Sequence, residues 1–536
     1  MDIESRLASM TLEQKIGQMI IAGFETGSSD DPHFQTLVHR YHVGNVILFT
    51  RNLGEREETM RLTDGIRRTI EEDCGIAPFV VIDQEGGMVT RIFRAGNIVP
   101  GPMAVGATYD EKNAYRIGSI IGEEMRALGM NMDFAPAVEE ALFRTPSNIS
   151  VRTYSDNPYM VAAFCRQFVR GLQEHGVIAT IKHFPGYTGV LEDAHLAVPT
   201  VFRTRNEMEK VELQAFQKVI DDGADAVLAG HMLCPALEPE RRLTSASRRV
   251  ITELLKEKMG FKGLITSDCM DMHSLLDFYG AGRGAVEIVK AGVHLLDISH
   301  RLETQAEVCE ALRQAVLDGE IPMEQIDDNV RHILKYKEKY GLMAAAEPAE
   351  KRAVSVDWAK NRRICEEISA KSVTIVRGDE NLPLKKGNGL FISTKPITLV
   401  IVDEKIDAGN TFAVAAAQRM GGTAREISLN PTEDEIEVLA REAADKDYVV
   451  IGTYNAYCNE GQRKLLEAIR QNNKNLIAIA LRASYDYDCY ADIPTCLLAY
   501  EYTELSVHSV LDVLEGCKKA VGLAPLALGD SYIRKL

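Results

Sequence analysis

Three residues of the sequence have the types and the spacing that acid–base and covalent chemistry need. Asp193 precedes His195 by two positions, so its carboxylate can hydrogen-bond the imidazole, fix its tautomer and raise its basicity. Such a histidine has an unperturbed pKa of about 6.5, so it can donate a proton in one step and accept one in the next. Asp268 closes an otherwise apolar segment, a position that suits a carboxylate nucleophile. Helix capping is the alternative for this region, and Ser267 or Asp271 would fill that role equally well.

A second group of residues suits a polyhydroxylated ligand such as a sugar, because hydroxyl groups need both hydrogen-bond donors and acceptors. The group comprises one acid and four basic side chains, namely Asp83, Arg91, Arg152, Lys182 and His183. Taken singly, each has an ordinary structural explanation as a helix cap, a surface charge or a satisfied histidine.

Metal binding is the alternative for the Asp-x-His pair. It would need further ligands at defined spacing, and no convincing set accompanies the pair, so we predict no metal and no cofactor.

The elements that must position these residues are strand-like. Eight apolar segments recur, and they are Gln18–Phe24, Val43–Phe49, Phe79–Asp83, Asn131–Pro136, Val177–His183, Ala226–His231, Gly263–Asp268 and Val293–Ile298. Helical patterns lie between several of them, at Glu111–Leu128, Tyr159–His175 and Glu207–Asp222. These units predict a (β/α)₈ barrel of the TIM type, in which catalytic groups collect where the strands end. A doubly wound sheet is the alternative, but no Gly-x-Gly-x-x-Gly follows the first strand.

The rest of the chain predicts a second domain. We assign residues 1–342 to the barrel, 343–370 to an Ala- and Glu-rich linker with a connecting helix, and 371–536 to a smaller α/β domain. The expected architecture of this last domain is an open, mostly parallel sheet. Its predicted strands are Ser372–Val376, Ile397–Val402, Tyr448–Gly452, Leu476–Leu481 and Leu497–Tyr500, and its predicted helices are Glu433–Ala444 and Gly461–Asn472.

Composition excludes several classes of partner. An apolar share of 46% and a charged share of 26% are those of a globular protein. The net charge of −17 argues against nucleic acid and anionic membranes, which both favour a basic surface. No stretch reaches the roughly 18 apolar residues of a membrane helix, and no leader pattern opens the sequence. Ten cysteines without CxxC pairs fit reduced thiols. We therefore predict a cytoplasmic protein, as a monomer or a homodimer.

The order of short motifs along the barrel half resembles glycoside hydrolase family 3, and within it the bacterial β-N-acetylglucosaminidases. The matching motifs are Val46-Ile47-Leu48-Phe49 with Arg51-Asn52, Asp83-Gln84-Glu85-Gly86-Gly87 with Arg91, Asn131-x-x-Phe134-Ala135-Pro136, Arg152, Lys182-His183-Phe184-Pro185-Gly186, Asp193-x-His195, Ala229-Gly230-His231-Met232 and Ser267-Asp268-x-Met270-x-Met272. The second domain resembles the C-terminal α/β domain of some members, at Gly452-Thr453-Tyr454-Asn455-Ala456 and Gly461-Gln462.

This resemblance implies roles for the residues singled out above. Asp268 would be the nucleophile, and His195, oriented by Asp193, the general acid/base. The glycosyl unit would be held by Asp83, Arg91, Arg152, Lys182, His183, His231 and Met270. Retaining glycosidases commonly use two carboxylates, whereas this subgroup places a His–Asp dyad in the acid/base role.

The resemblance also implies the reaction. We expect a retaining exo-β-N-acetylglucosaminidase that acts on small soluble glycosides such as muropeptide or chitin fragments, in peptidoglycan recycling. The close alternatives are a phosphorylase, with inorganic phosphate as a further partner, and a β-glucosidase. A neutral imidazole base would not repel a phosphate dianion as a carboxylate would. A non-catalytic sugar-binding or sensor protein is the alternative from another class, and the joint presence of the three candidate catalytic residues weighs against it.

Four features depart from the family pattern. A shorter loop begins at Tyr187-Thr188-Gly189, and Ala194 stands where Ser or Thr is usual between the acid and the histidine. Both shape the loop that carries the dyad, so they bear on aglycone preference and loop closure. Glu139 replaces the common Asp after the fourth strand, and His294 falls where an Asp often precedes Leu-Leu. These two bear on barrel packing or on the sugar subsite. None removes a catalytic group.

Overall fold

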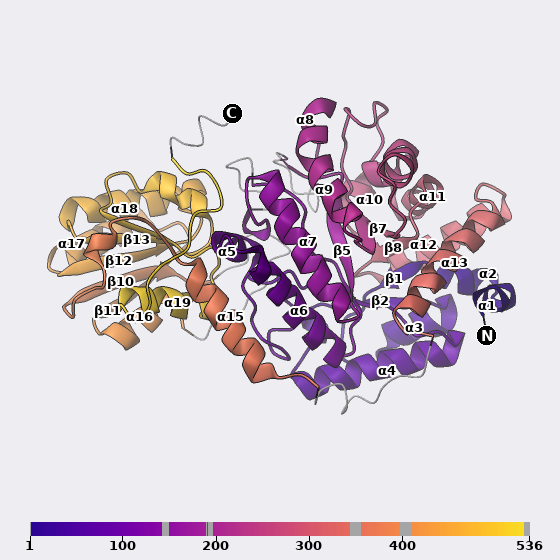
Figure 1. Ribbon diagram of the computed structural model, residues 1–536, viewed down its shortest axis with the longest axis horizontal. Coiled ribbons are helices and arrows are strands. Elements are labelled where there is room, and N and C mark those ends of the chain that lie inside the picture. The colour runs from indigo at the N-terminus through magenta and orange to yellow at the C-terminus, as the bar shows by residue number, and fades with distance from the viewer. Residues whose placement is uncertain are drawn as a thin grey trace.

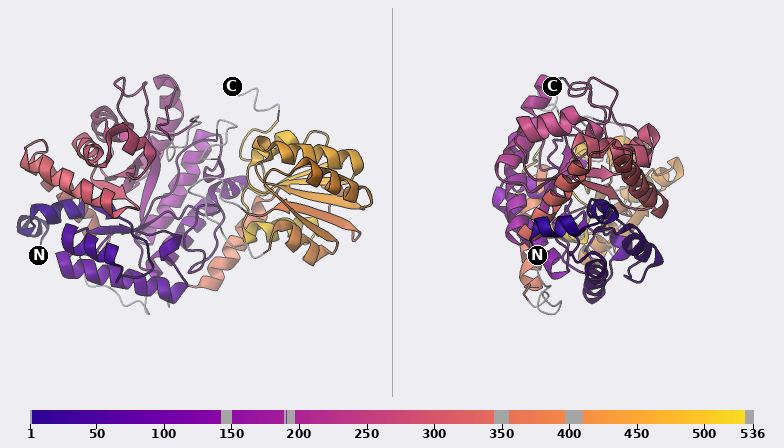
Figure 2. Two further views of the ribbon diagram at one scale, coloured as in Figure 1. Left: turned by 180° about the vertical axis from the view of Figure 1, so that it is seen from behind. Right: turned by 90° about the vertical axis from the view of Figure 1, so that its right-hand side faces the viewer.

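The computed structural model describes residues 2–141, 150–188, 190, 197–343, 355–396 and 410–529. Asp193, His195 and the predicted strand Ile397–Val402 lie outside these residues. Two bodies lie along the long axis of the molecule, an N-terminal barrel and a C-terminal sheet flanked by helices (Figures 1 and 2).

The N-terminal body is a closed barrel of eight parallel strands in chain order. The strands are β1 (Ile20–Ala22), β2 (Asn45–Ile47), β3 (Val80–Ile82), β4 (Met132–Asp133), β5 (Ile178–Phe184), β6 (Ala226–Ala229), β7 (Leu264–Cys269) and β8 (Leu295–Ile298). Pairing of Ile21 with Asp297 joins the last strand to the first. Each predicted segment overlaps one of these strands, so the predicted barrel is confirmed. Apolar runs at this spacing give strands that are buried on both faces, as a parallel barrel requires.

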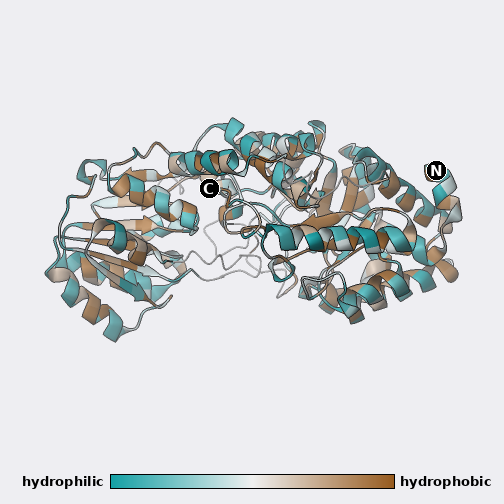
Figure 3. Cartoon of the chain, turned by 90° about the horizontal axis from the view of Figure 1, so that it is seen from below, coloured by the Kyte–Doolittle hydropathy of each residue, from teal (hydrophilic) through white to brown (hydrophobic). Residues whose placement is uncertain are grey.

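Helices surround the barrel, and their bounds are α1 (Ile3–Ser9), α2 (Leu12–Gln18), α3 (Pro32–Tyr41), α4 (Arg56–Cys74), α5 (Pro102–Ala107), α6 (Glu111–Ala127), α7 (Pro158–Glu174), α8 (Arg205–Lys210), α9 (Glu212–Asp221), a π-helical segment (Arg249–Lys258), α10 (His273–Tyr279), α11 (Ala281–Ala291), α12 (Leu302–Leu317) and α13 (Met323–Lys339). The predicted helix Glu207–Asp222 is broken in two, because the backbone of Val211 leaves the helical region. In Figure 3 the barrel strands are mostly apolar, and the helices around them alternate polar and apolar residues.

Of the described helices, none is long and apolar enough to cross a bilayer. The cytoplasmic location stays a prediction.

The C-terminal body is a six-stranded sheet in the order β11-β10-β12-β13-β14-β9. Its strands are β9 (Thr374–Arg377), β10 (Gly389–Thr394), β11 (Thr423–Ile427), β12 (Tyr448–Thr453), β13 (Leu476–Ala480) and β14 (Thr495–Leu498). Only β9 runs antiparallel, beside β14, so the predicted mostly parallel sheet is confirmed. The helices are α15 (Trp358–Ser372), α16 (Phe412–Met420), α17 (Glu433–Ala444), α18 (Glu460–Asn472) and α19 (Glu504–Leu514).

The sequence pattern missed β10 and β11. β10 is fully buried, but Gly389 and Ser393 interrupt its apolar run. β11 is an edge strand that exposes Arg425 and Glu426, so it carries no hydrophobic alternation for a pattern to detect.

The two bodies share a packed interface. Met88, Met103 and Val151 of the barrel belong to the apolar core of the C-terminal body. Polar contacts add to it: Ser155 Oγ donates to the carbonyl oxygen of Pro525 at 2.5 Å, and Asp156 accepts from the N–H of Ala527 at 2.8 Å. The C-terminal body therefore braces barrel loops that follow β3 and β4.

At the opposite end of the barrel, a buried lysine makes stability depend on pH. Lys337 of α13 donates to Gln18 Oε1 at 2.8 Å and to the carbonyl oxygen of Gly44 at 3.1 Å. Within the described part of the chain it forms no ion pair, and burial lowers its pKa to about 7. Between that value and the ordinary 10.5 the unfolded chain binds more protons than the folded one, so the contribution of Lys337 to stability increases as pH rises through this window.

Lys337→Met is therefore expected to flatten the rise of unfolding free energy between about pH 7 and 10. The hydrogen bonds that the variant loses shift its stability equally at all pH values, so the slope and not the absolute stability is diagnostic. Urea unfolding at several pH values measures it, with the exposed Lys335→Met as the matched control. Equal pH slopes in the wild type and both variants would contradict the assignment.

Candidate active site

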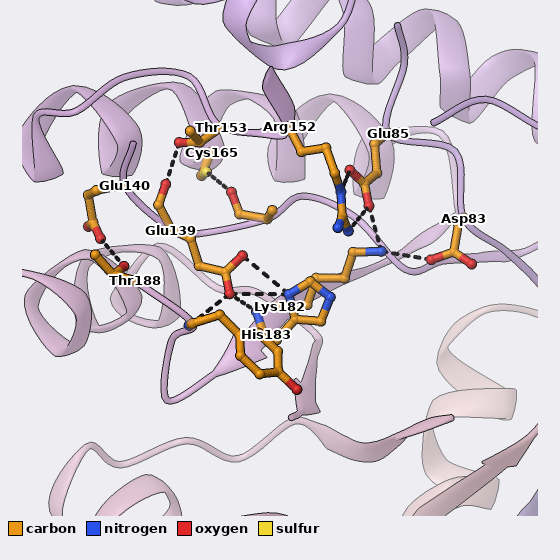
Figure 4. A network of polar contacts seen from close by, with 12 residues as sticks. Asp83, Glu85, Glu139, Glu140, Arg152, Thr153, Cys165, Lys182, His183 and Thr188 are labelled. Atoms are coloured by element: carbon orange, nitrogen blue, oxygen red, sulfur yellow. Dashed lines mark hydrogen bonds and ion pairs between the residues drawn. The ribbon is translucent and has the colours of Figure 1, made fainter. Parts of the chain in front are cut away.

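The sequence-predicted residues that the structure describes gather where the barrel strands end. Asp83 follows β3, Lys182 and His183 lie near the end of β5, and Asp268 lies near the end of β7. Arg152 comes from the segment after β4 and points toward Lys182 (Figure 4). Parallel strands bring these distant residues to one end of the barrel, as expected for this fold.

Lys182 and Arg152 form a buried ion-pair network with two acids. Lys182 Nζ lies 2.7 Å from both Asp83 Oδ1 and Glu85 Oε1. Arg152 binds Glu85 through two hydrogen bonds, of 2.9 and 2.7 Å. The side chain of Glu85 is only 1% exposed, whereas that of Asp83 is 19% exposed. Asp83 is therefore the most exposed member of the network.

The charges of this network are fixed by mutual neutralisation. Burial alone would raise the pKa of Glu85, but the adjacent Arg152 and Lys182 outweigh it and hold that pKa well below its usual range. Burial would likewise lower the pKa of Lys182, yet Asp83 and Glu85 raise it overall. The lysine thus stays a cation, and its donors are held in one geometry.

Glu139 orients His183. This buried carboxylate accepts from the backbone N–H of His183 at 3.3 Å and of Tyr187 at 3.1 Å. Both of its oxygens lie 3.2 Å from His183 Nδ1. With Nδ1 engaged by the acid, Nε2 is the ring nitrogen available to a further hydrogen-bond partner. Sequence reasoning had flagged Glu139 only as a departure from the family pattern; its position directly after the fourth strand was the available signal.

His231 contacts the segment that carries Asp268. Its Nδ1 lies 2.7 Å from Ser245 Oγ, and its Nε2 lies 3.1 Å from the carbonyl oxygen of Asp268. Since a carbonyl can only accept, Nε2 carries the proton and Nδ1 accepts from the serine. Burial lowers the pKa of His231, which favours the neutral ring. Asp268 itself is partly exposed, and its Oδ1 accepts from the backbone N–H of Cys269 at 2.9 Å.

The other two predicted residues, Arg91 and Met270, are buried beside this end of the barrel. The N–H of Arg91 donates to Gln84 Oε1 at 2.8 Å, and Arg91 is buried. The N–H of Met270 donates to the carbonyl oxygen of Asp297 at 2.8 Å, and Met270 is also buried. His294 lies away from this end: its Nδ1 accepts from Ile265 N–H at 2.9 Å, so its substitution bears on barrel packing.

The base of the predicted dyad loop is anchored in the barrel. Thr188 donates to Glu140 Oε2 at 3.1 Å, and Glu140 is buried. Asp193 and His195 follow in the part of the chain that is not described. Among the described residues, no group of three His, Cys, Asp or Glu side chains could hold a metal ion.

These features define a class of protein. A (β/α)₈ barrel presents a partly exposed carboxylate, Asp268, at the same end as a fixed set of charged donors and acceptors. This is the arrangement of a barrel enzyme with a polar, hydroxyl-rich ligand.

Comparison with known proteins identifies the family. Residues 11–336 match the family model described as "Glycosyl hydrolase family 3 N terminal domain". The chain belongs to this family and is a glycoside hydrolase.

Individual relatives cover nearly the whole chain. It is similar to a structure of a glycoside hydrolase family 3 β-N-acetylglucosaminidase from Paenibacillus sp. str. FPU-7, with 34% identity, a TM-score of 0.90, and coverage of 97% of this chain and 99% of that one. It is 25% identical to β-hexosaminidase A of Pseudoalteromonas piscicida over 93% of this chain and 91% of the relative. The likeness to a β-glucoside phosphorylase bound to 2FGlc, at 20% identity and a TM-score of 0.83 over 98% of this chain and 96% of that one, shows the fold alone.

Proposed function

We propose that this protein is a retaining, exo-acting β-N-acetylglucosaminidase that forms a covalent glycosyl-enzyme on Asp268. The names of two relatives, a β-N-acetylglucosaminidase and a β-hexosaminidase, support N-acetylglucosamine as the sugar that is released. The observation that carries the mechanism is the partly exposed Asp268 carboxylate at the barrel end that carries the Lys182 network. The Cys269 N–H donates to this carboxylate, and His231 bonds the backbone carbonyl of the same residue. Small soluble glycosides, such as muropeptide or chitin fragments, are the proposed substrates.

In the proposed first step, a carboxylate oxygen of Asp268 attacks the anomeric carbon while the glycosidic bond breaks. His195, oriented by Asp193, gives its proton to the leaving oxygen. In the second step the same imidazole takes a proton from water, whose oxygen attacks the anomeric carbon and frees Asp268. Two displacements on opposite faces of the sugar restore the β configuration.

The sugar is proposed to bind through the exposed end of the ion-pair network. Asp83 accepts from hydroxyl groups, and Lys182, Arg152 and His183 Nε2 donate to them. Because these donors are fixed by buried acids, they suit one terminal sugar in one orientation. Arg91 and Met270 remain proposed contacts of the same subsite. His231 is better placed to hold the backbone of the nucleophile.

Lys182→Met is expected to cost about 1–3 kcal/mol of transition-state stabilisation, because its sugar hydroxyl and Asp83 lose their donor. The measurement is kcat/KM on an aryl β-N-acetylglucosaminide, taken well below the unfolding temperature of the variant. Lys210→Met, at an exposed lysine of α8, is the control. An equal loss in both variants would contradict the assignment, and rapid internal cleavage of long chitin would contradict exo action.

One assay series tests the proposed function. Aryl β-GlcNAc and β-glucosyl substrates are compared with and without inorganic phosphate. Faster release from the GlcNAc glycoside, with free GlcNAc as the product, is expected. Preference for the glucoside would overturn the proposed sugar. A sugar 1-phosphate as the main product would instead identify a phosphorylase, in which phosphate replaces water at the imidazole base.

A further inference from the structure

The loop after β3 makes a tight turn that adjoins the C-terminal body. Gly86 and Gly87 have φ of +93° and +58°, which favours glycine at both positions. The N–H of Gly86 donates to the carbonyl oxygen of Val89 at 3.0 Å, and that of Gly87 to Val99 at 2.8 Å. Asp83 and Glu85 directly precede this turn. A displacement of the turn would therefore also displace these two carboxylates.

A carboxylate of the C-terminal body lies against this turn. Glu501, between β14 and α19, is buried, and its Oε2 accepts from the N–H of Gly101 at 2.6 Å. A Cβ built on Gly87 would lie 2.7 Å from the same oxygen, so the carboxylate is in direct contact with the glycine. The next residue, Tyr502, donates its N–H to Met88 Sδ at 3.4 Å. The turn is thus held from outside the barrel.

The inner end of the loop is fixed by the barrel itself. The N–H of Gln84 donates to Asp133 Oδ1 at 2.8 Å, and the Gln84 side chain bonds both Thr90 Oγ1 and Arg91 N–H. Asp83 and Glu85 therefore belong to a short segment that is held at two places. Asp133 of the barrel binds its inner end, and Glu501 of the C-terminal body binds its outer end.

Burying the carboxylate of Glu501 costs free energy that an apolar side chain at the same place would not cost. Within the described residues it forms no ion pair, and Thr503 Oγ1 is its second donor, at 3.0 Å. Burial raises its pKa to about 7. A buried carboxylate supported by one N–H and one hydroxyl lowers stability relative to an apolar side chain of similar size, so its presence favours a geometric task.

We infer that Glu501 is a positioning residue of the active site: through Gly87 and Gly101 it fixes the turn that sets Asp83 and Glu85 against Lys182. The C-terminal body then helps to position the residues of the sugar subsite, although it is remote from them in sequence. This inference rests on the proposed function for the role of Asp83 in sugar binding, whereas the mechanical link from Glu501 to the turn does not depend on any substrate.

Hydrogen exchange of the intact chain tests the mechanical link. Glu501→Ala is expected to speed amide exchange in residues 84–101 by about tenfold or more, since the outer anchor is lost. Glu501→Gln should keep the wild-type rate, because its amide oxygen can accept from Gly101. Tyr109→Phe, which removes a different contact between the bodies, from Tyr109 to the carbonyl oxygen of Ala524 at 3.0 Å, should leave this segment unchanged.

Two outcomes would overturn the inference: unchanged exchange in residues 84–101, or a uniform increase across the chain. If Glu501→Ala does not fold, Gly101→Ala perturbs the contact from the barrel side. Its backbone, at φ −74°, tolerates a side chain, but the added Cβ would lie 3.0 Å from both Glu501 Oε2 and Gly87 Cα, so it presses on both sides of the contact. It should raise exchange in the same segment, and wild-type rates there would equally contradict the link.

Kinetics test the consequence for the site. Glu501→Ala should lower kcat/KM by about tenfold or more, and Glu501→Gln should restore most of it. In an Asp83→Asn background the same substitution should cost less than about threefold, because the displaced turn and the lost Asp83 charge disturb the same contact with Lys182. Additive losses would overturn the coupling to Asp83. Absence of glycosidase activity even in the wild type would refute the proposed function, and the exchange measurement would still decide the link.

Discussion

Asp268→Asn is expected to remove nearly all turnover, with kcat lower by about 10³-fold or more. The amide has the shape of the carboxylate but no charge, so it cannot form the ester with the anomeric carbon. Its oxygen can still accept from the Cys269 N–H, and the backbone carbonyl that His231 binds is unchanged. The fold should therefore survive, and thermal unfolding of the variant checks this directly.

Asp271→Asn provides the matched control. Asp271 lies three residues further along, and its carboxylate bonds the N–H of His300 at 2.8 Å and Arg301 Nε at 3.1 Å. Its removal should change kcat less than about tenfold, since no bond to the substrate is proposed for it. Comparable losses in the two variants would show that the segment is sensitive to any lost charge, and that Asp268 has no special role.

His195→Ala is expected to separate substrates by their leaving group. A dinitrophenyl glycoside needs little protonation to depart, whereas a natural glycoside needs it fully. The variant should therefore form the glycosyl-enzyme from the activated substrate at nearly the wild-type rate and accumulate it. Its kcat/KM on natural substrates should fall by about 10²–10⁴-fold. Burst kinetics with both substrate types measure the difference.

Azide provides the complementary test of the same residue. It is a nucleophile that needs no general base, so it should restore turnover of His195→Ala and give a β-glycosyl azide. Asp193→Asn should show the same pattern more mildly, because it disturbs the orientation and charge of the imidazole without removing it. Equal slowing of activated and natural substrates, with no rescue by azide, would place the acid/base elsewhere in the chain.

Sequence patterns predicted the barrel well because its strands are buried on both faces. Runs such as Val80–Ile82 and Ala226–Ala229 are apolar throughout, and this signal is strong even for short strands. The exposed edge strand β11 and the interrupted strand β10 lack it, and they were missed. β11 escapes because its side chains are partly or fully exposed, whereas β10 is buried but has Gly389 and Ser393 in its run.

The site was predicted in part for a related reason. Residues at strand ends, such as Asp83, Lys182 and Asp268, could be placed together because parallel strands bring their ends to one side. Glu139 and Glu501 act on the site through contacts that depend on side-chain geometry. Glu501 follows the barrel residue Gly101 by 400 positions, and no spacing rule connects such residues. Their roles needed the structure.

The covalent intermediate on Asp268 is tested most directly by labelling with an activated 2-fluoro glycoside, followed by peptide mass spectrometry. The fluorine slows both displacements, and the good leaving group lets the first proceed, so the ester accumulates. The label is predicted on the peptide that contains Asp268, with loss of labelling in Asp268→Asn. A label on Asp83 or on any other carboxylate, or labelling that persists in the Asn variant, would contradict the proposed mechanism.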